Sequence, residues 1–220
     1  MYRRIALRAA FVLLLSGLAV ALWAEPATQP VAPDPQSSKA ALLGWSQQLP
    51  AGGVEKALEI YHTETPAERI AARAMAEENL ASATLQKLVT DKWGKAACDK
   101  IIRALSDESD DDLITADEKK DGDHVVIKFK DRGDDQVPLT MMKVDGKWKL
   151  SIAAFLKDAG ATGLELARFC RDVTTQIDIS TREFNAGQYN DVDALAKIVA
   201  QRIKDATENE DKKPDGPSPV

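Results

Sequence analysis

The pattern of apolar residues changes its period near the middle of this 220-residue chain, and this change limits the possible folds most. Over residues 124–152, apolar and polar positions alternate, as at Val125 and Ile127, which predicts half-buried strands. Asp145-Gly146 is a two-residue hairpin signal within this stretch. On both sides of it, apolar residues recur every three or four positions, as in amphipathic helices. We therefore predict an α+β fold.

The predicted sheet is an antiparallel meander of three or four strands. One strand begins at His124, and a second covers residues 137–144. The strand after the hairpin carries three apolar residues on one face: Trp148, Leu150 and Ile152. Residues 112–117 are the candidate for a fourth strand. The preceding helices are expected to cover this sheet.

Helices are predicted before the sheet. A short helix begins at Ser37 or Ser38 and ends at Pro50, and helical spacing resumes from Val54 to Tyr61. The clearest helix start is Thr65-Pro66-Ala67-Glu68, with threonine at the cap, proline in the first turn and glutamate where a capping box needs it. It predicts a helix from 66 to about 91, followed by another over 95–105.

Two amphipathic helices are predicted after the sheet. The first carries an apolar stripe from Leu166 to Ile177 and ends near Gly187, and Asp191 caps the second. Joined at 187–190, they form an αα-hairpin over residues 159–206. We expect this hairpin to pack on an α+β domain over residues 37–158.

The N-terminus has the pattern of an export signal. Three arginines at positions 3, 4 and 8 precede an uncharged stretch over 9–24, which is short for a membrane-spanning helix. We expect cleavage near Ala24 or, as second choice, Ala21, and a periplasmic or extracellular protein without a stable membrane span. An uncleaved signal anchor is the alternative. Residues 25–36 read as a proline-rich linker and 207–220 as a disordered tail.

The charge balance argues against a nucleic-acid partner. The chain has a net charge of −6, and removing residues 1–24 takes away three arginines and no acids, which gives −9. Such an acidic chain has no general attraction for nucleic acid or anionic lipid.

Cys98 and Cys170 are the only cysteines, and both fall on apolar helix faces. In an oxidising compartment they are candidates for a disulfide that links the first helical region to the last. The alternative is two separately packed core cysteines. Without a Cys-x-x-Cys motif, thiol redox catalysis is not expected.

No metal site, cofactor or catalytic constellation is predicted. The acidic run over 107–118 resembles a calcium loop but has Asp112 where such a loop needs glycine. His62 and His124 are the only histidines, and no phosphate-binding glycine loop or nucleophile motif occurs. The chain is therefore not expected to be an enzyme.

The order of helices, residues 121–127 (DGDHVVI), a strand and residues 144–150 (VDGKWKL) resembles the nuclear transport factor 2-like superfamily. That superfamily has a cystatin-like α+β cone of helices around a curved antiparallel sheet. The resemblance covers about residues 54–155. It implies a pocket inside the cone, for which the candidate lining residues are Ile127, Phe129, Met141, Met142, Trp148 and Leu150. The alternative is that these side chains only fill the core.

The expected function is that of an exported, non-catalytic binding or structural module, with an unknown protein partner or a small apolar ligand. The alternatives are a small-molecule carrier, an isomerase- or dehydratase-type enzyme that uses the cone pocket, and a dimerisation arm over 160–206. Isomerases of the superfamily use a pocket carboxylate with a tyrosine donor. Tyr61 and Tyr189 lie outside the predicted sheet, so this chemistry is not carried over.

Overall fold

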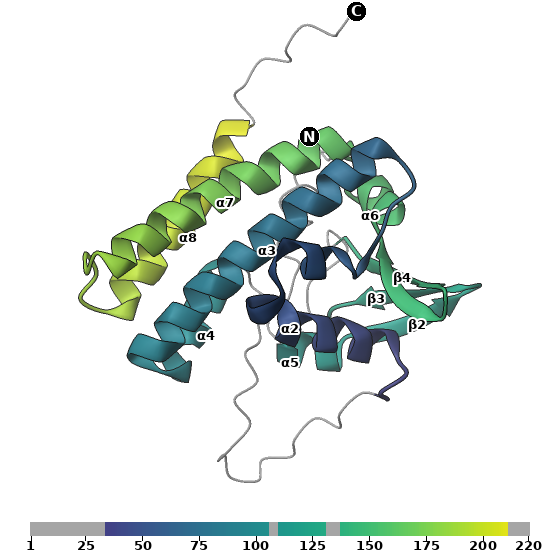
Figure 1. The fold of residues 1–220 in the computed structure, drawn as a ribbon, viewed down its shortest axis with the longest axis horizontal. Helices are drawn as coiled ribbons and strands as arrows, with labels where there is room; N and C mark the ends of the chain where they lie inside the picture. Colours follow the sequence, from purple (N-terminus) through teal and green to yellow (C-terminus); the bar gives the residue numbers. More distant parts are fainter. Residues whose placement is uncertain (1–33, 106–109, 131–136, 211–220) are drawn as a thin grey trace, which may run out of the picture.

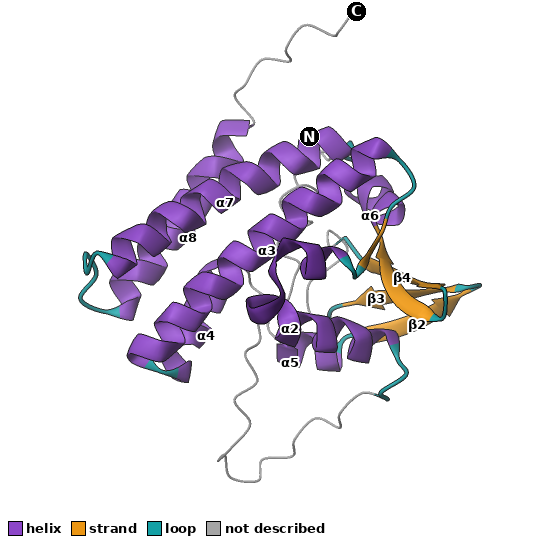
Figure 2. Ribbon diagram, viewed as in Figure 1, coloured by secondary structure: helices purple, strands orange, loops and turns teal. Residues whose placement is uncertain are grey.

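A computed structural model describes residues 34–105, 110–130 and 137–210. The predicted signal, most of the proline-rich linker and residues 211–220 lie outside the described residues. The described chain is α+β, as predicted, with a sheet beside a group of long helices (Figures 1 and 2). None of the described helices combines the length and the apolar character that crossing a membrane requires.

The sheet has five strands in the order β1-β5-β4-β3-β2. They are β1 (Tyr61–His62), β2 (Asp117–Asp121), β3 (His124–Lys128), β4 (Leu139–Val144) and β5 (Lys147–Ser151). Strands β2 to β5 form an antiparallel meander, whereas β1 pairs parallel to β5, with Tyr61 opposite Leu150. The sheet is therefore mixed, and it is wider than the predicted three or four antiparallel strands.

Two local assignments were wrong. The fourth strand of the meander is β2, and most of residues 112–117 belong to α5 (Asp110–Thr115). Ile152 does not continue β5 but begins α6 (Ile152–Ala159). The Ser151 hydroxyl accepts a hydrogen bond from the Ala154 N–H at 3.2 Å, and this cap turns the strand directly into a helix.

The hairpin turn between β4 and β5 has the geometry that its Asp-Gly sequence predicts. Asp145 and Gly146 both have positive φ, 51° and 77°. This is the conformation of a type I′ turn, which matches the twist of the two strands. The turn fixes the register in which Val144 pairs with Lys147.

Three helices come from the first part of the chain. Helix α2 (Ser38–Leu58) bends at Gly53, whose φ of 66° interrupts the helical path. Helix α3 (Pro66–Trp93) begins where the capping motif predicts: the Thr65 hydroxyl accepts from the Glu68 N–H, and the Glu68 carboxylate accepts from the Glu64 N–H. Gly94 ends α3, and α4 (Lys95–Leu105) follows.

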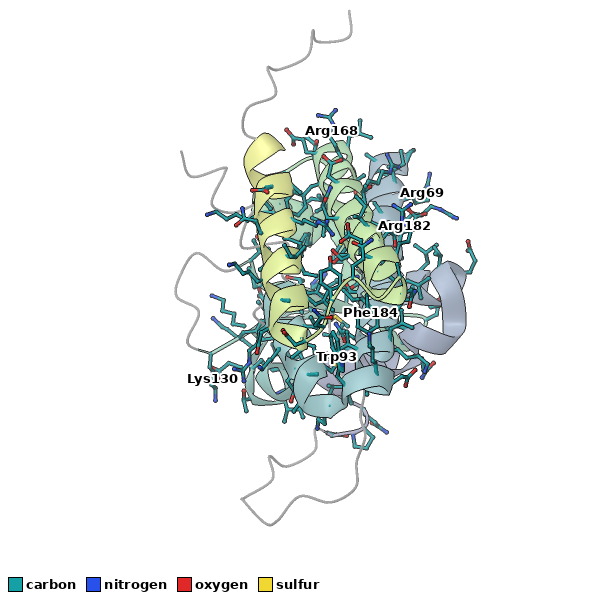
Figure 3. The ribbon with its side chains drawn as sticks, turned by 90° about the vertical axis from the view of Figure 1, so that its left-hand side faces the viewer. Arg69, Trp93, Lys130, Arg168, Arg182 and Phe184 are labelled. Atoms are coloured by element: carbon teal, nitrogen blue, oxygen red, sulfur yellow. The ribbon has the colours of Figure 1, made fainter. Side chains whose placement is uncertain are left out.

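The C-terminal helices are α7 (Gly163–Asn185) and α8 (Val192–Glu210). Helix α7 runs parallel to α3: Gly163 lies against the Ala67 carbonyl at one end, and the rings of Trp93 and Phe184 meet edge to face at the other (Figures 1 and 3). Helix α8 packs on both α7 and α4. It extends beyond residue 206, where the sequence predicted the tail to begin.

The buried side chains form two clusters, and α3 contributes to both. The sheet-side core lies between the sheet and helices α2, α3 and α6; it includes Leu42, Ala72, Ile127, Met141, Leu150 and Phe155. The helical core lies among α3, α4, α7 and α8; it includes Leu85, Ile101, Phe169, Val173, Leu195 and Val199. Helix α3 thus connects the sheet to the helical part of the molecule.

Candidate functional site

Five of the six residues predicted to line a cone pocket lie in or beside the sheet-side core. Ile127, Phe129, Met141 and Leu150 are buried in it, and Trp148 packs at its margin. The Trp148 indole N–H donates to the Gln36 carbonyl at 2.8 Å. Met142 alternates with Met141 along β4 and therefore belongs to the opposite face of the sheet.

A pocket of about 540 Å³ lies elsewhere, between the end of α2, the strand β1 and the first turns of α3. None of the six predicted residues lines it. Its described lining residues are mostly apolar, with a threonine and two arginines: Leu58, Tyr61, Thr63, Pro66, Arg69, Ile70, Ala72 and Arg73. It is open to solvent, and Ile70, one of its walls, remains 38% exposed.

Helix geometry explains how α3 forms one wall. Pro66, Arg69, Ile70 and Arg73 follow the spacing i, i+3, i+4, i+7, which places them on one face of the helix. The Thr65 cap fixes where this face begins. The opposite wall comes from the chain between Leu58 and Thr63, which is held in place by the pairing of β1 with β5.

The two arginines of the pocket differ in their partners. Arg73 forms ion pairs with Glu77 on its own helix, at 3.2 Å, and with Glu55 on α2, at 3.3 Å. The pair with Glu55 connects α2 to α3. The Arg69 side chain is exposed, and its guanidinium group forms no ion pair or hydrogen bond with the described residues. In Figure 3, Arg69 extends outward from the molecule at the upper right.

Behind this pocket is a buried polar cluster around Tyr61. The Asn79 side-chain amide donates to the Tyr61 hydroxyl at 3.2 Å and to the Met75 carbonyl at 2.7 Å. The Tyr61 ring meets Trp45 edge to face at 5.9 Å. Burial raises the pKa of the Tyr61 phenol well above its usual value, and the nearby Glu78 carboxyl raises it further. This tyrosine is therefore a neutral hydrogen-bonding group.

Glu78 is the most perturbed acid of the described residues. Although the residue as a whole is only partly buried, burial of its carboxyl group raises the pKa from 4.5 to about 8. The Ser82 hydroxyl donates to it at 3.4 Å and partly offsets this effect. The Cys170 thiol of α7 is also close enough for its pKa to respond to Glu78. The cluster therefore contains a carboxyl group that titrates near neutral pH.

Sequence reasoning missed both Tyr61 and Glu78. Tyr61 was placed on a helix, yet it lies in β1, on the sheet. Glu78 lay within a correctly predicted helix, and a signal for its burial was present: it shares the spacing of Ala71, Met75 and Leu85, which are all buried. An acid on an apolar stripe marks a position where burial shifts the pKa.

The candidate disulfide is not formed, because Cys98 and Cys170 are both free, buried thiols. The Cys98 thiol lies by Thr90, whereas the Cys170 thiol lies by Glu78. These two α3 residues are twelve positions apart, or about 18 Å along the helix, and a disulfide needs Cα atoms within about 7 Å. The structure therefore has two separately packed cysteines.

Metal-ligating residues do not gather in the part of the chain that the structure describes: it holds no cluster of three or more histidine, cysteine, aspartate or glutamate side chains suited to a metal ion. Residues 107–109 of the acidic run lie outside it. His62 is 3.4 Å from the Glu64 carboxylate on the surface, and His124 starts β3.

Comparisons of the chain with protein families, with curated proteins and with solved structures find no match.

Proposed function

We propose that this protein is an exported, non-catalytic binding module whose pocket between α2, β1 and α3 takes a small, largely apolar ligand. The export signal over residues 1–24 and membership in the nuclear transport factor 2-like superfamily are part of this proposal. The observation that carries it is the pocket itself: about 540 Å³ with mainly apolar walls.

The size and lining of the pocket support ligand binding. Ligand sites in proteins typically enclose about 300–1,000 Å³ and combine apolar walls with a few polar groups. Here Leu58, Ile70 and Ala72 supply apolar wall, and Thr63 and Arg69 supply polar groups. Ile70 remains exposed in the pocket, so a ligand that covers it removes apolar surface from water.

The lining favours binding over catalysis. Among the described lining residues are no carboxylate, imidazole or thiol to act as base or nucleophile. Tyr61 lines the pocket, but burial holds the pKa of its phenol above the usual range, so the phenol serves as a hydrogen-bonding group.

Binding of a neutral fluorescent probe tests the proposal. The mature protein is titrated with N-phenyl-1-naphthylamine, whose fluorescence rises in apolar sites. We expect saturable binding at one site, weakened by Ile70→Ser. The matched control is Leu164→Ser on α7, because Leu164 is also exposed (60%) but lies outside the pocket lining. Absence of saturable binding, or equal loss in both variants, would contradict the pocket.

Mass spectrometry of the exported protein tests the cleavage of the signal: an intact Met1 would contradict it.

A second candidate is an isomerase-type enzyme, favoured by the Glu78 carboxyl with its pKa of about 8 next to the neutral Tyr61 phenol. A base of this pKa is suited to proton abstraction near neutral pH. NMR of small cyclic ketones in D₂O gives the test. An enzyme would exchange protons next to the carbonyl faster than buffer does, and Glu78→Gln would abolish this. Exchange no faster than in buffer excludes this candidate.

A further inference from the structure

We infer that the ligand of the α2–β1–α3 pocket is an amphipathic anion, whose apolar chain lies along the pocket and whose single anionic head group pairs with Arg69. This inference rests on the proposed function, because it names the ligand class for the same pocket. The inference is based on the two arginines of the pocket lining, which a purely apolar ligand would leave unused.

The face of α3 that forms the pocket wall presents apolar and cationic groups together. Ile70 and both arginines line the same pocket, and Arg73 follows Ile70 by three positions and Arg69 by four, so it neighbours both on the helix surface. A ligand that covers Ile70 therefore comes within reach of a guanidinium group. A purely apolar ligand would cover Ile70 while also removing water from Arg69, which is unfavourable unless the charge gains a partner.

Arg73 already has acidic partners. Its ion pairs with Glu55 and Glu77 place two carboxylates on one guanidinium group, so this end of the pocket carries no excess positive charge. The ion pair with Glu55 also connects α3 to α2, so Arg73 acts as a structural part of the pocket wall.

Arg69 is the cationic group left for a ligand. It has no ion pair with the described residues, and the described lining includes no acid that would neutralise it. Its nearest acidic neighbour in sequence, Glu68, is buried, and its carboxylate accepts from the Glu64 N–H at 2.7 Å and the Thr65 hydroxyl at 3.0 Å. A guanidinium group binds carboxylate and phosphate oxygens through paired N–H donors. The pocket therefore matches one negative charge.

The volume indicates the size of the apolar part. A water molecule occupies about 30 Å³ in the liquid, so about 540 Å³ corresponds to roughly eighteen atoms of that size. This is enough for a head group and an unbranched chain of about ten carbon atoms. The open side of the pocket leaves the head group near solvent, where Arg69 lies.

Displacement of the neutral fluorescent probe tests the inference. Three ligands with the same ten-carbon chain are compared on the mature protein: decanoate, decanol and decyltrimethylammonium. We expect decanoate to displace the probe at about two- to fivefold lower concentration than decanol, as one exposed ion pair provides. The cation should be weakest. Raising the salt concentration should weaken decanoate and leave decanol unchanged.

Two variants locate the charge. Arg69→Gln should remove the preference for decanoate over decanol while the neutral probe still binds. Arg168→Gln is the matched control, because Arg168 is an exposed arginine of α7 outside the pocket lining (Figure 3). Thermal unfolding of both variants should match the parent protein, since neither arginine is buried.

The outcomes separate the two claims. If the neutral probe binds but decanol equals decanoate, or if Arg69→Gln keeps the preference, the anion inference is wrong and the pocket stands. If neither the probe nor any of the three ligands binds, the proposed function is wrong as well. Equal loss in the Arg168 variant would also overturn the assignment to Arg69.

Discussion

Replacing Glu78 with glutamine removes the one carboxyl group that, among the described residues, the fold holds in its neutral form near pH 7. Glutamine has nearly the same shape, and its amide oxygen can still accept the hydrogen bond from the Ser82 hydroxyl. It does not titrate. The substitution therefore isolates the part of the unfolding free energy that depends on the ionisation of Glu78.

The sign follows from the raised pKa. Between 4.5 and about 8 the folded protein keeps the Glu78 proton that the unfolded chain has lost, so the free energy of unfolding falls as pH rises. Each pH unit in this window corresponds to about 1.4 kcal/mol. Glu78→Gln should therefore gain about 3 kcal/mol relative to the parent protein between pH 5 and pH 7, approaching about 5 kcal/mol above pH 8.

Urea unfolding at pH 5, 7 and 9 gives this difference directly. The control is Glu77→Gln, one residue away, because the Glu77 carboxylate is exposed and pairs with Arg73 on the surface. It should change the stability by less than about 1 kcal/mol, since exposed ion pairs contribute little. A stability difference between Glu78→Gln and the parent protein that stays constant from pH 5 to pH 9 would refute the reasoning.

Two further predictions concern the C-terminal helices. Gly163→Ala should destabilise the protein by about 1–3 kcal/mol, because the new Cβ would lie 2.4 Å from the Ala67 carbonyl oxygen and push α7 from α3. Gly44→Ala, with open space around it, should instead be stabilising by about 0.5–1 kcal/mol; equal thermal shifts would contradict the close packing. Arg202→Met should lower the unfolding free energy by about 1–3 kcal/mol at pH 7, because Arg202 donates two hydrogen bonds of 2.8 Å to the 25% exposed Glu183 carboxylate. Since this pairing lowers the pKa of Glu183, the effect should be complete above pH 4.5 and disappear as pH falls through the lowered pKa; a loss independent of pH would contradict the ion pair.

The elements set by nearby residues could be predicted from the sequence. The Thr65 cap and the Asp145-Gly146 turn act within a few positions of the chain, so both formed where expected. The capping box at the start of α7, with Thr162 and Glu165, has the same local origin. The α+β class followed from the two periodicities of apolar residues, which depend only on which face of an element is buried.

The elements that depend on distant partners could not be predicted. Tyr61 continued a helical spacing in the sequence, but pairing with Leu150 makes it a strand residue at the edge of the sheet. The six residues expected to line a pocket are apolar and fall in the predicted sheet, as the lining of a cone pocket would. Periodicity gives the face that is buried, but it does not distinguish a filled core from a cavity.

The sequence by itself determined where α3 begins, where the hairpin turns and which faces are apolar, because these follow from backbone preferences and local hydrogen bonds. Only the tertiary structure decided that α3 and α7 run side by side, that the Glu78 carboxyl is buried and that α2, β1 and α3 surround a pocket. The physical reason is that burial and cavity shape arise from contacts between residues far apart in the chain, and no local pattern encodes which of them meet.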